Sequence, residues 1–480
     1  MMNLLSVGPN PLRSGGVAFY QRALHNEFIK HKINPYYLGV DQIDHSKEKS
    51  YIVKSIDESF SNQIYDLILC KGVYFGAVDP AFQVNEDSAN KIFEKFLIDN
   101  KITVVHFHAT RPASLIKIAK EIDCRVIVSL HDYWYLCSLG FRVMPNRTLC
   151  NGDDGKKCAK VCDSFSRDRE DYVVKNNFNK TIRSKIKSFL KFILKNNYKY
   201  IEEFLQRNTQ NILPAVNSIE SRGGLSPVML HPQHEWISRQ SEIIDFLNNF
   251  SDSILAVSDI VYERHIESGV DTKKISVLNS GYEDADTNFF LQSRSVNRPI
   301  NKDKIKLIFI SPLYPEKGLH VLLDSMKSIK NKNNIEIEIY GKKELWAKGY
   351  WEKLITKLPS NVKFYGTFDY NNLPNMFSGS DISIVCPIMQ DPSPRVVWES
   401  LAAGVPVIAS KESGASDFIN DGINGLLFKS GDSMHLANCI DRLVEDPNLV
   451  SKLQKNINKL KTIDKHSLEL ISIYNDKRSI

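Results

Sequence analysis

The chain has 480 residues, of which 42% are hydrophobic and 25% charged, and its formal net charge is +6. This length predicts two domains, and the composition is that of ordinary soluble globular proteins. No apolar run approaches the roughly 20 residues of a membrane span, and the N-terminus lacks the basic and apolar regions of a signal peptide. We therefore expect a cytoplasmic protein whose eight cysteines are mostly reduced.

The chain begins with a predicted strand at Asn3–Val7, a Gly-rich loop and a helix from Val17 to about Lys30. Backbone N–H groups and the helix N-terminus in such a loop favour an anion. Gly15 and Gly16 are therefore candidates for contact with a nucleotide diphosphate or a transferred group. A tight turn between strand and helix is the alternative interpretation.

Further strands are predicted at residues 64–70, 104–108 and 126–130. Their alternation with helical patterns predicts a parallel sheet. His131 directly follows the last of these strands, so it is expected to face a cleft at the carboxyl edge of the sheet. His131 is a candidate catalytic residue, and a structural histidine beside Asp132 is the alternative.

Four cysteines follow in a loop-like stretch rich in Gly, Asp and Lys. Cys137, Cys150, Cys158 and Cys162 have the spacing C-x12-C-x7-C-x3-C. Clustered thiols in a reducing compartment suggest a structural Zn²⁺ bound by four thiolates. Independent reduced cysteines and an iron–sulfur cluster are the alternatives.

Residues 173–200 contain eight Lys or Arg and no acid, with apolar residues on one helical face. Such a basic amphipathic helix favours peripheral contact with an anionic membrane. The alternative is a helix that packs on its own domain and exposes its lysines to solvent. No stacking platform or RNA-binding motif accompanies the charge, so we expect no nucleic-acid partner. We interpret residues from about 137 to 250 as an insertion in the first domain.

A polar stretch at 286–304 is the predicted linker between a first domain, 1–285, and a second, 305–462. A C-terminal helix within 463–480 is expected to cross back to the first domain. In the second domain, Lys317 begins a helix above a strand, where a lysine neutralises phosphate as a point charge. Gly341 ends another strand, where a base or ribose can approach the backbone.

The most informative stretch is 386–408. An apolar strand leads into a loop with Asp391, Ser393 and Arg395, then a short helix with Glu399, and a second strand. This is a βαβ unit whose loop opens at the carboxyl end of a strand, where open α/β sheets bind ligands.

These motifs resemble those of the glycosyltransferases with the GT-B fold, in particular the retaining family 4 (glycosyl transferases group 1). The resemblance covers nearly the whole chain and depends on Gly15-Gly16, His131–Trp134, Pro315–Gly318, Gly341 and Asp391–Pro406. It implies an α/β chain with two Rossmann-like domains whose parallel sheets face a central cleft. The C-terminal domain would bind a nucleotide-sugar donor, and the N-terminal domain a glycan or lipid-linked glycan acceptor. No cofactor would be required for catalysis.

The resemblance also implies roles for single residues. Glu399 would bind the ribose hydroxyls, Lys317 the diphosphate, and Asp391 the sugar hydroxyls near the anomeric carbon. Gly15-Gly16 would face the diphosphate across the cleft, and His131 would approach the donor sugar from the other side. Ser393, Arg395 and Gly341 would complete the donor site.

The sequence departs from the family pattern in the donor loop. Asp391 stands where the family usually has Glu. Pro392 and Pro394 lack backbone donors, where the family often has Gly-Phe-Gly. Ser311-Pro312 occupies the family's Gly-Arg position. We expect Arg395 to restore a positive charge near the phosphates, and a surface arginine is the alternative.

The resulting hypothesis is a retaining glycosyltransferase of surface polysaccharide or lipopolysaccharide biosynthesis, working at the inner face of the plasma membrane. A non-catalytic nucleotide-sugar-binding scaffold is the alternative. A glycan phosphorylase of the same fold is less favoured, because the sequence shows no matching cofactor-lysine signature.

Overall fold

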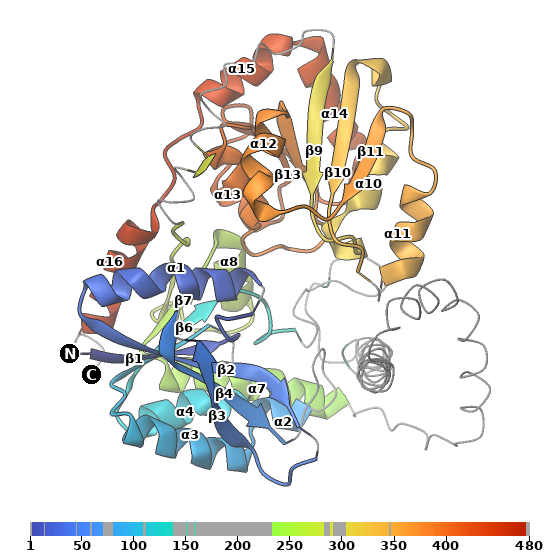
Figure 1. Ribbon diagram of the computed structural model, residues 1–480. Coiled ribbons are helices and arrows are strands. Elements are labelled where there is room, and N and C mark those ends of the chain that lie inside the picture. The colour runs from blue at the N-terminus through green and yellow to red at the C-terminus, as the bar shows by residue number, and fades with distance from the viewer. Residues whose placement is uncertain are drawn as a thin grey trace, which may run out of the picture.

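The computed structural model describes residues 2–13, 15–44, 46–57, 60–70, 80–108, 112–137, 150, 158, 233–282, 289–290, 304–344 and 347–476. These residues form two α/β domains, one above the other in Figure 1, each built on its own sheet. The expected α/β class with two Rossmann-like domains is confirmed. The basic segment 173–200 and nearly all of the predicted linker lie outside the described residues.

The N-terminal sheet has the order β3-β4-β2-β1-β5-β6-β7-β8. Its strands are β1 (Met2–Gly8), β2 (Ile33–Ile43), β3 (Tyr51–Asp57), β4 (Ser61–Leu69), β5 (Val104–Phe107), β6 (Arg125–Leu130), β7 (Ser253–Ala256) and β8 (Ile275–Val277). All neighbours pair in parallel except β3 and β4, which are antiparallel. The predicted parallel sheet is therefore confirmed, and it carries one antiparallel edge strand, β3, that was not predicted.

Seven α-helices of the described chain accompany this sheet. They are α1 (Gly16–Lys30), α2 (Pro80–Val84), α3 (Asp87–Asp99), α4 (Ser114–Glu121), α7 (Gln233–Phe250), α8 (Asp259–Glu267) and α16 (Ile463–Asn475). The last of these follows the whole C-terminal domain in the sequence, yet it lies beside α1 (Figure 1). Its Ile463, Leu470 and Tyr474 share a buried cluster with Leu4 and Phe28. The C-terminal helix thus completes the core of the N-terminal domain.

The C-terminal sheet is parallel throughout, in the order β11-β10-β9-β12-β13-β14. Its strands are β9 (Ile305–Ile310), β10 (Ile335–Tyr340), β11 (Val362–Gly366), β12 (Ile382–Val385), β13 (Val407–Ser410) and β14 (Gly425–Phe428). Successive strands run outward in one direction up to β11 and in the other from β12. The strand order therefore reverses between β9 and β12, which is where doubly wound sheets bind nucleotides.

The helices of this domain are α10 (Leu319–Ser325), α11 (Lys348–Ile355), α12 (Leu373–Ser378), α13 (Arg395–Ala402), α14 (Ser433–Glu445) and α15 (Pro447–Lys455). Short 3-10 turns lie at Pro315–Lys317, Lys332–Asn334, Tyr370–Asn372 and Gly414–Asp417.

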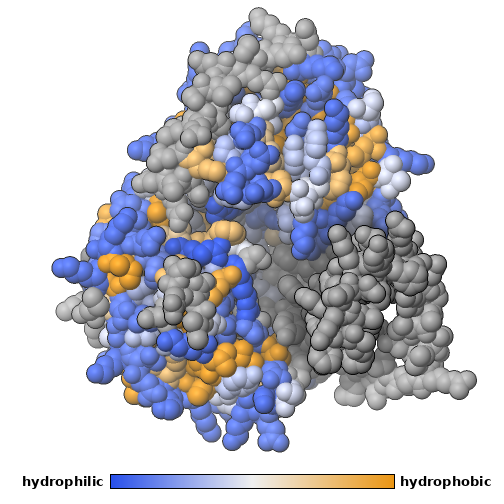
Figure 2. Space-filling model, in the orientation of Figure 1, coloured by the Kyte–Doolittle hydropathy of each residue, from blue (hydrophilic) through white to orange (hydrophobic). Residues whose placement is uncertain are grey.

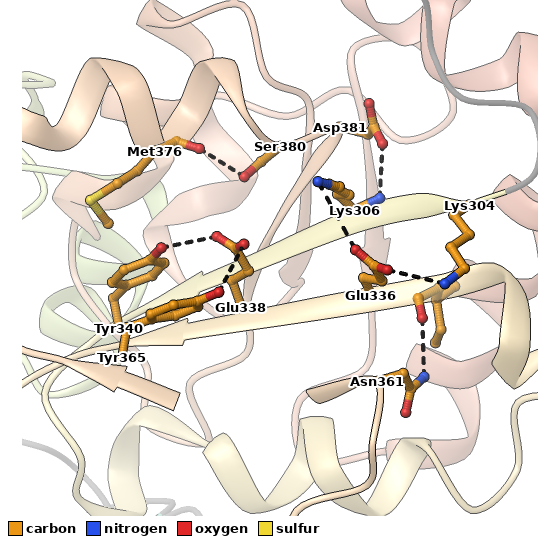
Figure 3. Close-up of polar contacts among 11 residues, drawn as sticks. Lys304, Lys306, Glu336, Glu338, Tyr340, Asn361, Tyr365, Met376, Ser380 and Asp381 are labelled. Carbon is orange, nitrogen blue, oxygen red and sulfur yellow. Dashed lines mark hydrogen bonds and ion pairs between the residues drawn. The ribbon is translucent and has the colours of Figure 1, made fainter. Parts of the chain in front are cut away.

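Strand β10 shows how the sequence selects its faces. Its residues alternate, so that the three isoleucines are buried in a core shared with α10 and α14. Glu336 and Glu338 point to the other face, where Glu338 accepts hydrogen bonds from Tyr340 (2.9 Å) and Tyr365 (3.5 Å) (Figure 3).

The amino ends of β9 and β12 are fixed by the buried Asp381. Its carboxylate accepts a hydrogen bond from the Lys306 backbone N–H at 2.8 Å (Figure 3). Its own backbone N–H donates to the Lys306 carbonyl, also at 2.8 Å. The two strands then pair only at Ile382–Leu307 and Ser383–Ile308. Their carboxyl ends are left unpaired with each other, and this leaves room for a pocket.

The chain crosses between the domains at two adjacent points. Tyr282 and Thr462 form a parallel bridge, in which the Ile463 backbone N–H donates to the Tyr282 carbonyl at 2.7 Å. A Cβ on Gly281 would come within 2.4 Å of the Thr462 carbonyl oxygen. The two crossings are therefore packed against each other without room for a side chain between them.

A second contact joins the domains near the cleft. The Asp417 carboxylate accepts hydrogen bonds from the backbone N–H of Asp259 (3.0 Å) and from Asn279 (2.8 Å). Asp259 is the first residue of α8, whose own N-cap residue, Ser258, makes no capping hydrogen bond. A residue of the C-terminal domain thus caps a helix of the N-terminal domain. Burial, together with the charges of Asp259 and Glu263, raises the pKa of Asp417 to about 6.

The described surface agrees with the low mean hydropathy of −0.27. Both domains are largely hydrophilic on the face shown in Figure 2. Among the described residues, no helix combines the length and the apolar character needed to span a membrane.

Candidate active site

A pocket lies at the strand-order reversal of the C-terminal domain. It is lined by the end of β9 and the residues after it (Phe309–Pro312), the end of β12 and the residues after it (Ile384–Pro387), and Lys317, Asp391 and Pro394–Val396. Three of the predicted donor-site residues, Lys317, Asp391 and Arg395, therefore line one pocket. The predicted Ser393 and Glu399 belong to the same loop and helix.

Lys317 and Asp391 form the central ion pair of this pocket. The Lys317 ammonium donates to the Asp391 carboxylate at 2.6 Å, and their side chains are 22% and 10% exposed. Burial disfavours the charged ammonium, but the Asp391 carboxylate and the Tyr314 hydroxyl outweigh it and raise the pKa of Lys317 above its usual value. The pocket thus presents a fixed positive charge next to a carboxylate.

Arg395 and Glu399 form a second pair, one turn apart on α13. The Arg395 Nε donates to the Glu399 carboxylate at 2.7 Å. Tyr370 joins them, because its hydroxyl donates to the same Glu399 oxygen at 3.1 Å and lies 2.8 Å from the Arg395 guanidinium. The carboxylate predicted to bind ribose is therefore held in place by two neighbours.

Arg395 also reaches the N-terminal domain. Its guanidinium carbon lies 5.3 Å from the ring centroid of Phe19 on α1, and that of Arg22 lies 4.2 Å from the same ring. Such contacts are typical of cation–π interactions. The first helix of the N-terminal domain is thus in contact with α13 of the C-terminal domain.

Ser393 connects the donor loop to the chain crossing. It shares a hydrogen bond with Tyr282, whose pKa burial raises to about 12. The Tyr282 ring stacks on Trp398 of α13, with centroids 4.0 Å apart. The first interdomain crossing is therefore packed directly against the candidate donor site.

The Gly-rich loop precedes α1 in the N-terminal domain. Gly15 has φ of 138°, a conformation that favours glycine, and a Cβ on Gly15 or Gly16 would meet no atom within 4 Å. The buried Asp66 holds the start of the loop by accepting a hydrogen bond from Asn10 at 2.9 Å. The backbone at both glycines is therefore open to a ligand.

His131 lies directly after β6, as expected, in a cluster of rings. Its Nε2 lies 3.1 Å from Nδ1 of His108, and its ring packs against Tyr20 at 5.1 Å between centroids. Burial lowers the pKa of His131 to about 4, so the imidazole is neutral at pH 7. His106 and His466 belong to the same cluster, and burial lowers their pKa values too.

The structure explains why position 341 is a glycine, which the sequence did not reveal. A Cβ there would lie 1.8 Å from the carbonyl oxygen of Ser311, which itself lines the pocket. Gly318 is similar, because its Cβ would lie 1.7 Å from the carbonyl oxygen of Cys386. The structure describes Gly341 as a close contact between two loops, and its role in donor binding stays a prediction.

The predicted zinc site is described only in part. Cys137, Cys150 and Cys158 are described and form no disulfide, and Cys162 lies outside the described residues. Zinc binding by the four thiols therefore stays a prediction. So does membrane contact by 173–200.

The sequence did not single out four residues that the structure brings to the site, namely Phe19, His108, Tyr370 and Tyr282. His108 had a usable signal, since it ends a predicted strand as His131 follows one. Phe19, Tyr370 and Tyr282 had none, because their roles depend on tertiary contacts.

Comparison with known sequences agrees with this geometry. The sequence model of the family described as "Glycosyl transferases group 1" matches residues 293–460. The putative glycosyltransferase YtcC of Bacillus subtilis is 24% identical over 233 residues, which are 45% of this chain and 56% of that protein. The lipopolysaccharide 1,2-N-acetylglucosaminetransferase of Salmonella typhimurium is 28% identical over 156 residues, 31% of this chain and 41% of that protein. The matched sequence thus spans about half the length of these curated relatives.

Comparison of structures extends the likeness to both domains. The crystal structure of HepE from Anabaena, in complex with UDP and glucose, superposes with a TM-score of 0.58 at 14% identity. The match covers 98% of this chain and 99% of that chain. At this identity the likeness concerns the fold alone. Residues 293–460 therefore match the model of the glycosyl transferases group 1 family, within a chain that has the GT-B fold.

Proposed function

We propose that this protein is a glycosyltransferase that moves a sugar from a nucleotide-sugar donor to a glycan or glycolipid acceptor. The observation that carries the proposal is the Lys317–Asp391 pair in the pocket between β9 and β12. A partly buried ammonium beside a carboxylate suits a donor whose diphosphate is anionic and whose sugar carries hydroxyl groups.

The chemistry follows from these two groups. Cleaving the bond between sugar and diphosphate leaves positive charge on the anomeric centre and negative charge on the leaving group. The Lys317 ammonium would stabilise the departing diphosphate, because it is already in place before the reaction. The Asp391 carboxylate would accept hydrogen bonds from the sugar hydroxyls, and Glu399 would do the same for the ribose.

The N-terminal domain would form the wall of the site opposite the pocket of the C-terminal domain. The open backbone at Gly15 and Gly16 allows close approach of the diphosphate. The neutral imidazole of His131 can exchange a hydrogen bond with the sugar without adding charge. Relatives named for lipopolysaccharide and capsular polysaccharide biosynthesis support an acceptor of that class.

Retention of configuration is the finer part of the proposal, and it follows from the resemblance to the retaining enzymes. The proton NMR coupling of the anomeric hydrogen in a purified product would distinguish an axial from an equatorial linkage. A product with inverted configuration would contradict retention and leave glycosyl transfer intact.

A donor screen tests the proposal as a whole. Calorimetric titration of the full chain with UDP-, GDP-, ADP- and dTDP-sugars, with donor turnover measured in parallel, should give binding and hydrolysis or transfer with at least one donor. Binding without turnover for any acceptor would favour a non-catalytic scaffold. The absence of binding to every donor would overturn both interpretations.

A further inference from the structure

The C-terminal end of α1 meets the first turn of α16 on the side of the N-terminal domain (Figure 1). Three side chains converge there, Glu27 from α1, His31 directly after it, and Asp464 from α16. One ligand atom from each lies within 4.8 Å of the other two. Glu27 and His31 are four residues apart, so they lie on the same side of the helix end.

Glu27 differs from an ordinary surface acid. Its side chain is only 8% exposed, and one carboxylate oxygen pairs with the Lys30 ammonium at 2.6 Å. The other oxygen, Oε2, is buried and has no hydrogen-bond partner among the described residues. A buried carboxylate oxygen without a partner is costly. A cation bound by the Glu27 carboxylate would offset this cost.

The chemistry of these three side chains favours one class of cation. Imidazole and carboxylate groups are both ligands of Zn²⁺, and a site with three protein ligands leaves the fourth position to water. Calcium and magnesium prefer all-oxygen sites, so the histidine favours a transition metal. We propose that Glu27, His31 and Asp464 bind a divalent transition-metal ion, with zinc as the best fit.

The surroundings permit such a site. His31 and Asp464 are exposed, so their side chains can rotate to bring the ligand atoms within about 2.0–2.2 Å of the metal. The Lys30 ammonium pairs with Glu27 from an exposed side chain (66%). Rotation of this exposed side chain towards solvent would take the Lys30 ammonium away from the metal.

The proposed ion would fasten α16 to α1. It would join two helices that are more than 400 residues apart in the sequence, at a place separate from the donor pocket. Its role is therefore to hold the returning C-terminal helix on the N-terminal domain, whatever reaction the cleft performs.

The test is a titration of the full-length chain, stripped with a chelator, with ZnCl₂ and separately with CoCl₂. The variants are His31→Ala and Asp464→Asn, both at exposed positions, and Glu27→Gln. His435→Ala, an exposed histidine in the C-terminal domain, is the matched control. Cobalt separates this site from the cysteine cluster, because thiolate ligands give intense charge-transfer bands that nitrogen and oxygen ligands lack.

We expect the wild type and His435→Ala to bind one ion without a thiolate signature, and zinc to raise their melting temperatures. His31→Ala and Asp464→Asn should weaken this event by at least the roughly 10–100-fold seen when an outer-shell partner is lost, and the rise in melting temperature should disappear. Equal binding by the wild type and both variants would overturn the proposal. So would a wild type whose only metal event has a thiolate signature.

Discussion

The two walls of the candidate site are built from different chemistry. The C-terminal wall contains ion pairs, with Lys317 bound to Asp391 and Arg395 bound to Glu399. The N-terminal wall contains neutral rings, among them Tyr20, His108 and His131. Helix α1 joins the walls, since its Phe19 contacts Arg395 and its Tyr20 contacts His131.

This contrast shows how the two walls of a cleft can each suit a different part of one substrate. Charged groups on one side suit the diphosphate, whose charge grows as the bond breaks. Neutral donors and acceptors on the other side suit sugar hydroxyls, because they bind without a large desolvation cost. The following changes test whether the division holds.

The largest expected effect comes from removing the charge of the C-terminal wall. Lys317→Met should lower kcat/KM for the donor by about 10²–10³, the range found for single groups that stabilise transition-state charge. Lys327→Met is the control, because Lys327 pairs with Asp324 on the exposed surface. Steady-state kinetics with the donor found in the screen would measure both. Similar losses in the two variants would contradict a specific role for Lys317.

Glu399→Gln should come next. This substitution keeps the shape of the side chain but replaces the carboxylate by a neutral amide. Hydrogen bonds to a charged acceptor contribute about 1.5–3 kcal/mol each, so those from the ribose hydroxyls should weaken. We expect affinity for the nucleoside diphosphate to fall roughly 10–100-fold, as measured by calorimetry. Tyr370→Phe removes only a neighbour of Glu399 and should have a smaller effect. Unchanged affinity in Glu399→Gln would refute its ribose role.

The buried neutral histidines around the N-terminal wall should make the stability of the protein depend on pH. Burial lowers the pKa of His466 to about 3 and that of His106 well below its usual value of 6.5. The unfolded chain therefore binds more protons below pH 6.5, so stability falls as the pH drops from 6.5 towards these folded-state values. His466 should contribute about 1–2 kcal/mol of this loss by pH 5, and His106 should act in the same direction.

Chemical denaturation at a series of pH values would measure this effect. His466→Gln should flatten the profile, and His435→Gln, at an exposed histidine, should leave it unchanged. An equally steep profile in His466→Gln would show that the cluster is not its source.

The smallest effect is expected at the Gly-rich loop. Gly15→Ala should cost about 1–2 kcal/mol of stability, because a side chain is strained at φ of 138°. It should also raise KM for the donor, since the new methyl group occupies open space on the ligand side. Gly422→Ala is the matched control, because Gly422 has φ of 74° and open space around it but does not line the pocket. An equal KM in both variants would place Gly15 outside the donor site.

The secondary structure of the site could be predicted, because patterns in the neighbouring sequence determine it. Strand, loop and helix around Asp391 and Glu399 follow from apolar periodicity and a glycine after the helix, and the structure forms them at these residues. Lys317 was found because it begins a helix after a strand. The pairing of Lys317 with Asp391 could not be predicted, because it joins residues 74 positions apart.

The missed strands have a similar explanation. Strand β2 contains Pro35 and Gly39, which weaken any strand pattern, and its pairing with β1 and β4 overrides them. Strand β3 lies at the edge of the sheet, where only its antiparallel partner β4 fixes its direction. The final helix begins at Ile463, before its strongest pattern near Leu468, because Thr462 caps it and Tyr282 holds its start.

The packing of α16 on the N-terminal domain has a consequence for the order in which the parts of the protein fold. Domains generally fold as units, the N-terminal one first during synthesis. Here the buried cluster around Phe28 is completed by Leu470 and Tyr474, which the ribosome adds only after the whole C-terminal domain. The nascent N-terminal domain must therefore keep part of its apolar surface uncovered throughout translation of the second domain. Its final folding step is a docking event between α1 and α16, the first and the last helices of the described chain.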